Sequence, residues 1–383
     1  MPVMKNKIII IGGGASALML ASLLPKGTAT ILESNSKLGA KILVSGGGKC
    51  NITNVKMGTE YFLGDADFVA PSLKSFNEKA LLRWLERQKL EPVLRKETQY
   101  FCKESAKELV DIFKKESKKQ NIILNTQVLS VAKRDDIFYV KTTQKTYSAT
   151  MLVVASGGLS FPKLGASAIG YEIAAHFGHN IIKTAPALVG FTVQKEQFFF
   201  KSLSGVSTEV SITVGEHLCK GALLFAHKGL SGPAVLDASL YWEKGKIEID
   251  FLLDFSWKSI EGSKKNITSL LLLPKRVTKA FLIELALKDK PYNAYTTSER
   301  EMLQTLSHYS FAPAGTFGYG KAEVTKGGVD TSEVDASTMM SKEEEGLYFL
   351  GEVLDVTGRL GGYNFQWAFS SAYSCAKNIK GKI

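Results

Sequence analysis

The sequence predicts an α/β fold with a Rossmann-like domain that is assembled from both ends of the chain. The first observation is a strand, a glycine turn, a helix and a second strand in succession between Lys7 and Glu33. The second is another buried strand, glycine turn and helix that begins near residue 347. The third is a β-rich and then helical texture from about residue 190 to residue 312, which indicates domains inserted between the two ends.

The N-terminal unit has the pattern of a dinucleotide-binding βαβ motif. Ile8 to Ile11 is an uninterrupted aliphatic run, as expected of a parallel strand that is buried on both faces. The turn Gly12-Gly13-Gly14 follows, and the small and aliphatic residues from Ala15 to Leu24 predict a helix. Thr28 to Leu32 predicts the second strand, with an acid at its tip.

The glycines and Glu33 suit the phosphates and the ribose of such a cofactor. Gly12 allows the tight turn, Gly14 lets a pyrophosphate approach the backbone, and the helix N-terminus offers free amides. Glu33 lies 19 residues after Gly14, where an acid accepts hydrogen bonds from an adenosine ribose. A secretory signal peptide is the alternative for this apolar start, but three consecutive glycines interrupt it and the motif continues in register.

The composition is that of an ordinary globular protein with an excess of positive charge. The 383 residues are 45% hydrophobic and 22% charged. The four cysteines are far apart, so neither a metal site nor a dithiol centre is expected, and the cytoplasm is the expected compartment. No membrane span is expected. The net charge of +11 is interpreted as solvated lysine-rich faces, because no basic run is interleaved with aromatic residues as in a single-strand binder.

Two further glycine-rich loops are expected to line the same cofactor. Gly46, Gly47 and Gly48 favour a loop whose amides form an anion nest, with Lys41 before it and Asn51 after it. Cys50 in this loop is predicted to be a packed thiol, because no paired base accompanies it. The second loop, Ser156, Gly157 and Gly158, follows a buried strand predicted at 151–155.

The last glycine turn indicates a cofactor longer than NAD. A buried strand at 347–350 leads into a group of turn residues and then into a helix predicted over 363–377. The turn residues include Gly351, Glu352, Asp355, Gly361 and Gly362. FAD would need so distant an element, with its ADP half on the first turn and its flavin half on the last, where a helix N-terminus stabilises negative charge.

The middle of the chain predicts inserted domains. The expected division is an N-terminal part over 1–189, a β-rich insert over 190–255 completed near 313–325, a helical insert over 256–312 and a C-terminal part over 313–383. Residues 121–149 are predicted to form a small antiparallel meander rather than another βαβ unit. His227, just before a helix predicted at Pro233, is a candidate for proton transfer, although a lone histidine is more often structural.

These residues resemble a known family, the BaiN-like or YhiN-like NAD(P)/FAD-dependent oxidoreductases, which include aminoacetone oxidase-like flavoproteins. The resemblance covers essentially the whole chain. Its motifs are GGGASA at Gly12, KILVSGGGKCNITN at Lys41, ASGGLSFPKLG at Ala155, FAHKGLSGP at Phe225, VTKGGV at Val324 and GLYFLGEVLDVTGRLGGYNFQWAFSS at Gly346. The family fold implies an FAD domain from both chain ends, with a β-barrel-like domain and a small helical domain inserted.

The resemblance also implies site residues. The implied FAD contacts are Gly12, Gly14, Ala15, Ser16, Glu33, Lys41, Gly46, Gly47, Gly48, Val128, Gly157, Gly351, Asp355, Gly361, Gly362, Tyr363 and Asn364. The glycine loops add Gly13, Asn51, Ser156, Gly158 and Glu352 as cofactor-binding candidates. The candidate catalytic residues are His227 and Tyr363, and no metal is expected.

Together these observations predict an FAD-dependent oxidoreductase that acts by hydride transfer through flavin N5 on a small molecule. The other redox partner is NAD(P)H or oxygen, so both an NAD(P)H-dependent reductase and an amine-oxidase-like enzyme stay open. One alternative is a flavin-dependent RNA-modifying enzyme, which the sequence disfavours because it shows no added RNA-binding module. Another is a non-catalytic FAD-binding redox sensor.

Overall fold

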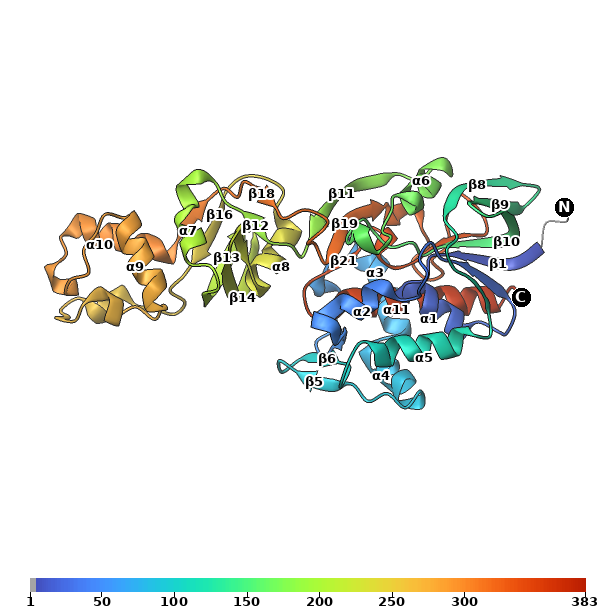
Figure 1. The fold of residues 1–383 in the computed structure, drawn as a ribbon, viewed down its shortest axis with the longest axis horizontal. Helices are drawn as coiled ribbons and strands as arrows, with labels where there is room; N and C mark the ends of the chain where they lie inside the picture. Colours follow the sequence, from blue (N-terminus) through green and yellow to red (C-terminus); the bar gives the residue numbers. More distant parts are fainter. Residues whose placement is uncertain (1–4) are drawn as a thin grey trace. The chain divides into compact units, whose positions relative to one another are not determined.

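The computed structural model describes residues 5–383, which divide into two compact units (Figure 1). The first unit runs to Pro186 and resumes at Glu323, and the second comprises Ala187–Ala322. The second unit therefore holds both the β-rich and the helical segments, together with residues 313–322, which the sequence analysis assigned to the C-terminal part.

The first unit is organised around a seven-stranded sheet in the order β7-β2-β1-β10-β9-β8, with β20 also paired to β10. Its strands are β1 (Lys5–Ile11), β2 (Ala29–Leu32), β7 (Asn121–Ile123), β8 (Val128–Arg134), β9 (Ile137–Thr142), β10 (Thr146–Val154) and β20 (Leu347–Phe349). Ile8 pairs in parallel with Ala29 of β2 and Met151 of β10. The aliphatic run from Ile8 to Ile11 is buried on both faces, as its sequence predicted.

Two strand predictions in this unit were wrong. Residues 121–123 are not part of a meander, because β7 pairs in parallel with β2 and so completes a βαβ arrangement. In the sequence, the glycine pair Gly327-Gly328 after a strand predicted at 322–325 indicates a turn, but both glycines lie inside β19 (Val324–Val329), which pairs with β11 (Ile181–Ala187). In both cases the strand partner is far away in sequence, so local pattern did not reveal it.

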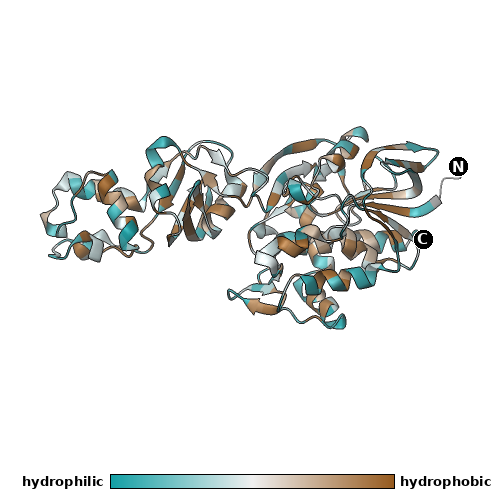
Figure 2. Ribbon diagram, in the orientation of Figure 1, coloured by the Kyte–Doolittle hydropathy of each residue, from teal (hydrophilic) through white to brown (hydrophobic). Residues whose placement is uncertain are grey.

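Helices α1 (Ala15–Leu23) and α11 (Tyr363–Lys380) pack against each other although they come from opposite ends of the chain (Figure 1). The other helices of this unit are α2 (Ala40–Val44), α3 (Ala66–Ser75), α4 (Glu78–Arg87), α5 (Lys107–Ser117) and α6 (Ile169–His176). In Figure 2 the strands of the main sheet are largely hydrophobic. Buried side chains such as Phe113, Trp367 and Phe369 lie in the same core.

Smaller sheets carry residues of the candidate site. β3 (Asn51–Asn54), β6 (Gln99–Phe101) and β5 (Val93–Arg95) form a three-stranded antiparallel sheet. β4 (Phe62–Leu63) pairs with β21 (Thr357–Gly358).

The second unit contains a seven-stranded sheet in the order β17-β16-β13-β14-β15-β12-β18. Its strands are β12 (Phe191–Thr192), β13 (Ser207–Val214), β14 (His217–Ala226), β15 (Gly229–Ser231), β16 (Ile247–Asp250), β17 (Tyr309–Phe311) and β18 (Gly315–Thr316). Helix α8 (Pro233–Tyr241) begins at the predicted proline.

The helical segment of this unit does not have a core of its own. Its helices α9 (Lys275–Glu284) and α10 (Thr297–Gln304) place Phe281 and Leu303 in the same buried cluster as Phe225 and Phe251 from the β-rich segment. Short helix α7 (Phe199–Ser202) adds Phe200 to this cluster. Within residues 5–383, no helix is long and apolar enough to cross a membrane.

Candidate cofactor site

The carboxyl ends of three neighbouring parallel strands bring the predicted glycine turns together. β1 ends at Ile11, and the amide of the next residue, Gly12, donates to Leu32 O of β2 at 2.8 Å. β10 leads into Ser156-Gly157-Gly158, and Ala155 N donates to Ile11 O at 3.0 Å. β20 leads into Gly351, and Leu350 N donates to Val154 O at 3.0 Å. This edge of a parallel sheet is where open α/β folds bind ligands.

The first turn leaves space where a phosphate is expected. Gly12 has a φ of +102°, and a Cβ there would lie 2.6 Å from Ala155 O, so only glycine fits between the two turns. Gly14 has nothing within 4 Å of its Cβ position and precedes α1, whose first turn, with Ala15 and Ser16, has no acidic residue and no side-chain cap. The amides and the positive dipole end of α1 are thus available to an anion.

Glu33 is held rigidly at the tip of β2. Its Oε2 accepts from Gly13 N at 2.6 Å, and its Oε1 accepts from Asn35 N at 2.7 Å. The side chain is nearly buried, and Thr126 N donates to the main-chain oxygen of the same residue at 2.9 Å. Val128, at the start of β8, follows Thr126 by two residues. The bond from Thr126 therefore brings Val128 close to Glu33, the predicted ribose acceptor.

The second helix N-terminus is assembled from three segments. Gly362 has a φ of +97° and caps α11 without a side-chain bond, and a Cβ there would lie 2.8 Å from Asn51 Oδ1. Asn54 Nδ2 donates to Gly361 O at 3.0 Å. Asn51 Nδ2 donates to Gln99 Oε1 at 2.8 Å, while its buried Oδ1 has no hydrogen-bond partner among the described residues. An unsatisfied buried acceptor beside a free helix end is a site prepared for a ligand that donates a hydrogen bond.

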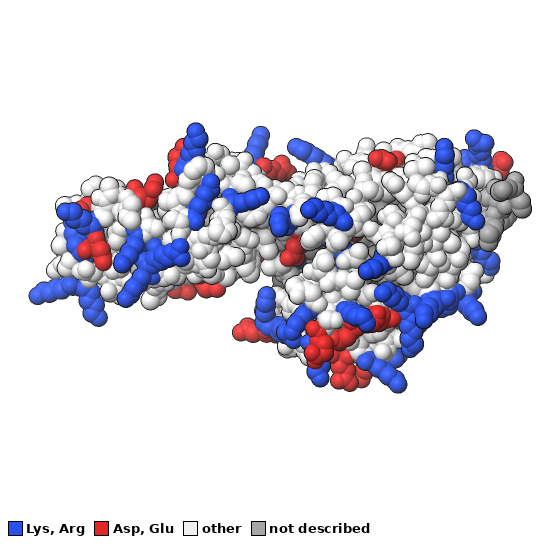
Figure 3. Space-filling view, viewed as in Figure 1, with Lys and Arg blue, Asp and Glu red and all other residues white. Residues whose placement is uncertain are grey.

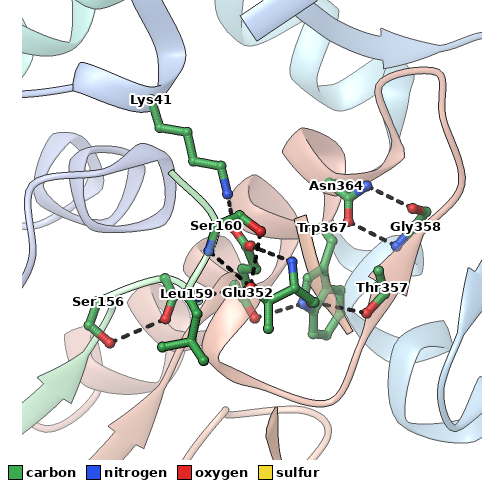
Figure 4. A network of polar contacts seen from close by, with 12 residues as sticks. Lys41, Ser156, Leu159, Ser160, Glu352, Thr357, Gly358, Asn364 and Trp367 are labelled. Atoms are coloured by element: carbon green, nitrogen blue, oxygen red, sulfur yellow. Dashed lines mark hydrogen bonds and ion pairs between the residues drawn. The ribbon is translucent and has the colours of Figure 1, made fainter. Parts of the chain in front are cut away.

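A polar network links the N-terminal and C-terminal site residues (Figure 4). Lys41 Nζ lies 2.6 Å from Glu352 Oε2, and both side chains are partly buried. Glu352 Oε1 accepts from Thr325 N at 2.9 Å. Thr325 Oγ1 in turn accepts from Leu159 N at 2.8 Å, in the loop that follows Gly158. The network therefore fixes three site loops relative to one another.

Asp355 lies in the segment between β20 and α11, and Asn364 lies in the first turn of α11. Burial, and secondly the Asp330 carboxylate, raise the pKa of Asp355, and a bond with the Gly327 backbone partly opposes them. Asn364 exchanges two hydrogen bonds with Gly358, donating to its oxygen at 2.7 Å and accepting from its amide at 2.9 Å. This pair holds the start of α11 against β21.

The loop with three glycines is more ordered than expected. Residues Ser45–Gly48 form a 3-10 turn between α2 and β3, with Gly46 and Gly47 in left-handed conformations. Nothing lies within 4 Å of the Cβ positions of Gly47 and Gly48, so their backbone faces open space. Cys50 is fully buried and burial raises the pKa of its thiol, which agrees with a packed thiol and not a nucleophile.

The two catalytic candidates lie in different units. Tyr363 is the first residue of α11, is nearly buried, and stacks on Tyr61 with ring centroids 4.8 Å apart and planes at 10°. His227 lies in the second unit, in the exposed turn between β14 and β15. The structure thus brings Tyr363 to the predicted cofactor residues, and the role of His227 stays a prediction.

Several residues of this site were not identified from sequence. Thr325, Gln99 and Tyr61 lie in it through bonds to distant partners or by ring stacking. Thr325 belongs to the VTKGGV motif, which was a usable signal, whereas neither Gln99 nor Tyr61 lies in a recognisable pattern.

The profile of the HI0933-like protein Rossmann domain matches residues 6–378, almost the whole chain. The chain belongs to the HI0933-like family. This is the BaiN/YhiN family of FAD-dependent oxidoreductases that the sequence motifs indicated.

The chain is similar over nearly its full length to enzymes of two kinds. The chain is 38% identical to the ribosomal RNA dihydrouridine synthase of Haemophilus influenzae, over 97% of this chain and 98% of the relative. It is 37% identical to the ribosomal RNA dihydrouridine synthase of Escherichia coli, with 97% of each chain covered. It is 29% identical to the 3-dehydro-bile acid delta(4,6)-reductase of Clostridium scindens, over 96% of this chain and 97% of the relative.

Solved structures confirm the fold class. A 3-ketosteroid delta1-dehydrogenase from Sterolibacterium denitrificans matches 99% of this chain and 100% of its own with a TM-score of 0.52 and 12% identity. A flavocytochrome c3 fumarate reductase matches 99% of this chain and 79% of its own with a TM-score of 0.51 and 14% identity. At these identities the likeness shows the fold alone.

The residues present fit FAD. Helices α1 and α11, which are far apart in sequence, both begin at the site without a side-chain cap. The unpartnered Asn51 Oδ1 and the open space at Gly14 also indicate a ligand there. One helix end suits a pyrophosphate, and the other suits an anionic ring.

Proposed function

We propose that this protein is an FAD-dependent reductase that saturates the C5–C6 double bond of a uracil ring in ribosomal RNA. The observation that carries the proposal is the 38% identity over nearly the full length of a ribosomal RNA dihydrouridine synthase. The second kind of relative supports the reaction class, since a 3-dehydro-bile acid delta(4,6)-reductase also acts on a carbon–carbon double bond conjugated to a carbonyl. RNA as the partner reverses our preference from the sequence, which rested on the lack of a contiguous basic and aromatic run.

FAD, when bound and reduced, would supply the hydride that such a reaction requires, and we propose NAD(P)H as the source of the electrons that reduce it. The Gly12–Gly14 turn and the N-terminus of α1 would hold its pyrophosphate, and Glu33 would accept hydrogen bonds from its ribose. Asn51 Oδ1 would accept a hydrogen bond from its ring system beside Gly362.

The protein must also deliver a proton to the carbon next to the carbonyl, because saturating the bond adds a hydride and a proton. Tyr363 is the proposed donor, since it is the titratable side chain on the first turn of α11 beside the predicted ring site. The buried Cys50 and Cys102 are poor candidates for a nucleophile because burial raises the pKa of both thiols, to about 11 in Cys102.

The test is to incubate the purified flavin-loaded protein with protein-free ribosomal RNA and NADH or NADPH, and then to measure dihydrouridine by mass spectrometry. We expect dihydrouridine at one or a few positions and loss of product when the flavin is removed. Tyr363→Phe should reduce turnover by about 100-fold or more with flavin content unchanged, as for loss of a general acid. Product with no RNA substrate but with a conjugated ketone would instead favour the small-molecule reductase.

His227 offers a matched comparison because the structure places it in the exposed turn of the second unit. If His227→Ala lowers turnover as much as Tyr363→Phe while flavin stays bound, the proton-transfer assignment moves to His227.

A further inference from the structure

The second unit carries a shallow groove between α7 and α9. It has a volume of about 270 Å³, and its lining includes Phe199, Leu203, Arg276, Lys279, Ala280 and Ile283. None of these residues belongs to the cofactor site described above. The groove is therefore a surface feature separate from the cofactor site.

The floor of the groove is apolar and rigid. Phe199 is half-buried, and its ring packs against Phe200 and Phe281 with centroids 4.5 Å and 5.4 Å away. Both of these partners are buried in the core of the unit, so Phe199 is fixed in position. Ile283, which also lines the groove, is 80% exposed, so its side chain is accessible to a ligand there.

The wall of the groove is positively charged. Arg276 and Lys279 lie three residues apart on α9, so they project from the same side of the helix, and both are exposed. Arg276 also donates a hydrogen bond to Ser202 O, which joins α9 to α7. In Figure 3, Lys and Arg side chains gather over the part of the second unit that holds α9. Glu284 is the acidic residue of the lining.

A neighbouring aromatic and lysine pair extends this surface. Phe198 is 46% exposed, and Lys201 Nζ lies 3.3 Å from the centroid of its ring. The groove therefore combines an aromatic side chain from α7 with cationic side chains from α9, and these two helices are about 75 residues apart in sequence.

We propose that this groove binds single-stranded RNA, with Arg276 and Lys279 on phosphates and Phe199 and Ile283 against bases. This inference rests on the proposed function, because RNA is the substrate there. Single-strand binders combine cations that follow the backbone with aromatic surfaces on which bases stack, and that combination is present in this groove. A protein partner would favour a broader apolar face with fewer charges in its centre.

The experiment measures binding of the full-length, flavin-loaded protein to a fluorescein-labelled single-stranded RNA of about 20 nucleotides and mixed sequence, by anisotropy across a salt series. The double variant Arg276→Gln/Lys279→Gln should weaken binding about tenfold at low salt. It should also reduce the slope of log affinity against log salt by about 1.4, because each lost phosphate contact on a single strand contributes about 0.7. Ile283→Ser should weaken binding a few-fold with the slope unchanged.

The control removes the same charge elsewhere. Lys114→Gln/Lys118→Gln changes two exposed lysines on or beside α5 of the first unit, and it should leave the affinity within about twofold. Thermal melting of each variant shows that the second unit remains folded.

The outcomes separate the two proposals. If the Arg276 and Lys279 variant makes dihydrouridine and binds RNA with unchanged affinity and slope, the groove is not the RNA site although the proposed function stands. If wild-type protein binds RNA through the groove but makes no dihydrouridine from ribosomal RNA, the proposed function fails and the groove assignment stands. Equal losses in the α5 control would overturn the groove assignment, since binding would then depend only on overall charge.

Discussion

The two helices of the cofactor site begin differently from helix α10 of the second unit. In the first unit, α1 and α11 start at Gly14 and Gly362 with no side-chain cap. In the second, Thr296 and Glu299 form a full capping box at the start of α10. Asn77 caps α4 inside the first unit, so an uncapped start is not a property of the whole unit. At α1 and α11 the uncapped start coincides with a glycine turn of the cofactor site, where the helix N-terminus can bind a ligand.

The hydrophobic cores of the two units also differ in composition. The first unit surrounds an aliphatic sheet whose parallel strands β1, β10 and β20 end at the site, whereas the second is held by a cluster of aromatic rings around Phe200. The contrast is therefore between backbone turns at the site and aromatic side-chain packing in the second unit. Substitutions in each unit test this contrast.

The largest effect is expected from Phe200→Ala. Phe200 is fully buried and packs against Phe225, Phe251 and Phe281, so its truncation should destabilise the second unit by about 3–5 kcal/mol. Calorimetry should show one early transition while flavin stays bound to the first unit. Phe198→Ala, at an exposed neighbour, is the control and should cost about 1 kcal/mol or less. Loss of flavin in Phe200→Ala would show that the two units do not fold independently.

The second-largest effect is expected from Gly14→Asp, which should lose its flavin. The side chain has open space and a suitable helix-capping position, so the flavin-free protein should be as stable as wild type or more so. The carboxylate would nevertheless face the pyrophosphate and weaken FAD binding by at least about 100-fold, because opposed like charges cost several kcal/mol. The measurement is the flavin-to-protein absorbance ratio, with Gly262→Asp in an open loop of the second unit as the control. Full flavin content in Gly14→Asp would exclude α1 as the pyrophosphate site.

A smaller effect is expected from Thr296→Ala. Thr296 Oγ1 accepts from Glu299 N at 3.3 Å, and the Glu299 carboxylate accepts from Thr296 N at 2.7 Å. Removing the cap should destabilise the second unit by about 1 kcal/mol and leave flavin content unchanged. If Thr296→Ser keeps the stability of wild type whereas Thr296→Val loses as much as Thr296→Ala, the hydroxyl is responsible for the cap.

The smallest effect concerns pH and His179 of the first unit. Its Nε2 lies 2.7 Å from Ser341 Oγ, its Nδ1 lies 3.4 Å from Glu333 Oε2, and its ring meets Phe349 of β20 edge to face. Burial lowers the pKa of His179, and the carboxylates of Glu333 and Glu343 oppose the shift without cancelling it.

A lowered folded-state pKa has a definite sign in stability. Between that pKa and the ordinary value of 6.5, the unfolded chain binds more protons, so the first unit should lose stability as the pH falls below 6.5. Urea unfolding followed by flavin fluorescence at several pH values should show this dependence, and His179→Gln should flatten it. Exposed His308→Gln is the control and should not change it. If His179→Gln leaves the pH dependence of stability unchanged, other titratable groups are responsible for that dependence.

The local chemistry of the cofactor site was readable from sequence. The βαβ unit, the three glycine turns and the start of α11 were all predicted, because periodicity and glycine position are properties of short segments. The packed Cys50 was predicted because the sequence shows no paired base beside it. What failed were features with distant partners, namely the parallel pairing of β7 and the place of Gly327 and Gly328 inside β19.

By itself, the sequence determined that a dinucleotide cofactor site with glycine turns at both chain ends exists in an α/β protein. Only the tertiary structure decided that Lys41 pairs with Glu352, that Asn51 Oδ1 lies buried beside Gly362, and that Phe199 meets Arg276 across a groove. The physical reason is chain distance, because side-chain bonds and surfaces form between segments that only the packed core brings together, whereas turns and helix ends are fixed by their own residues.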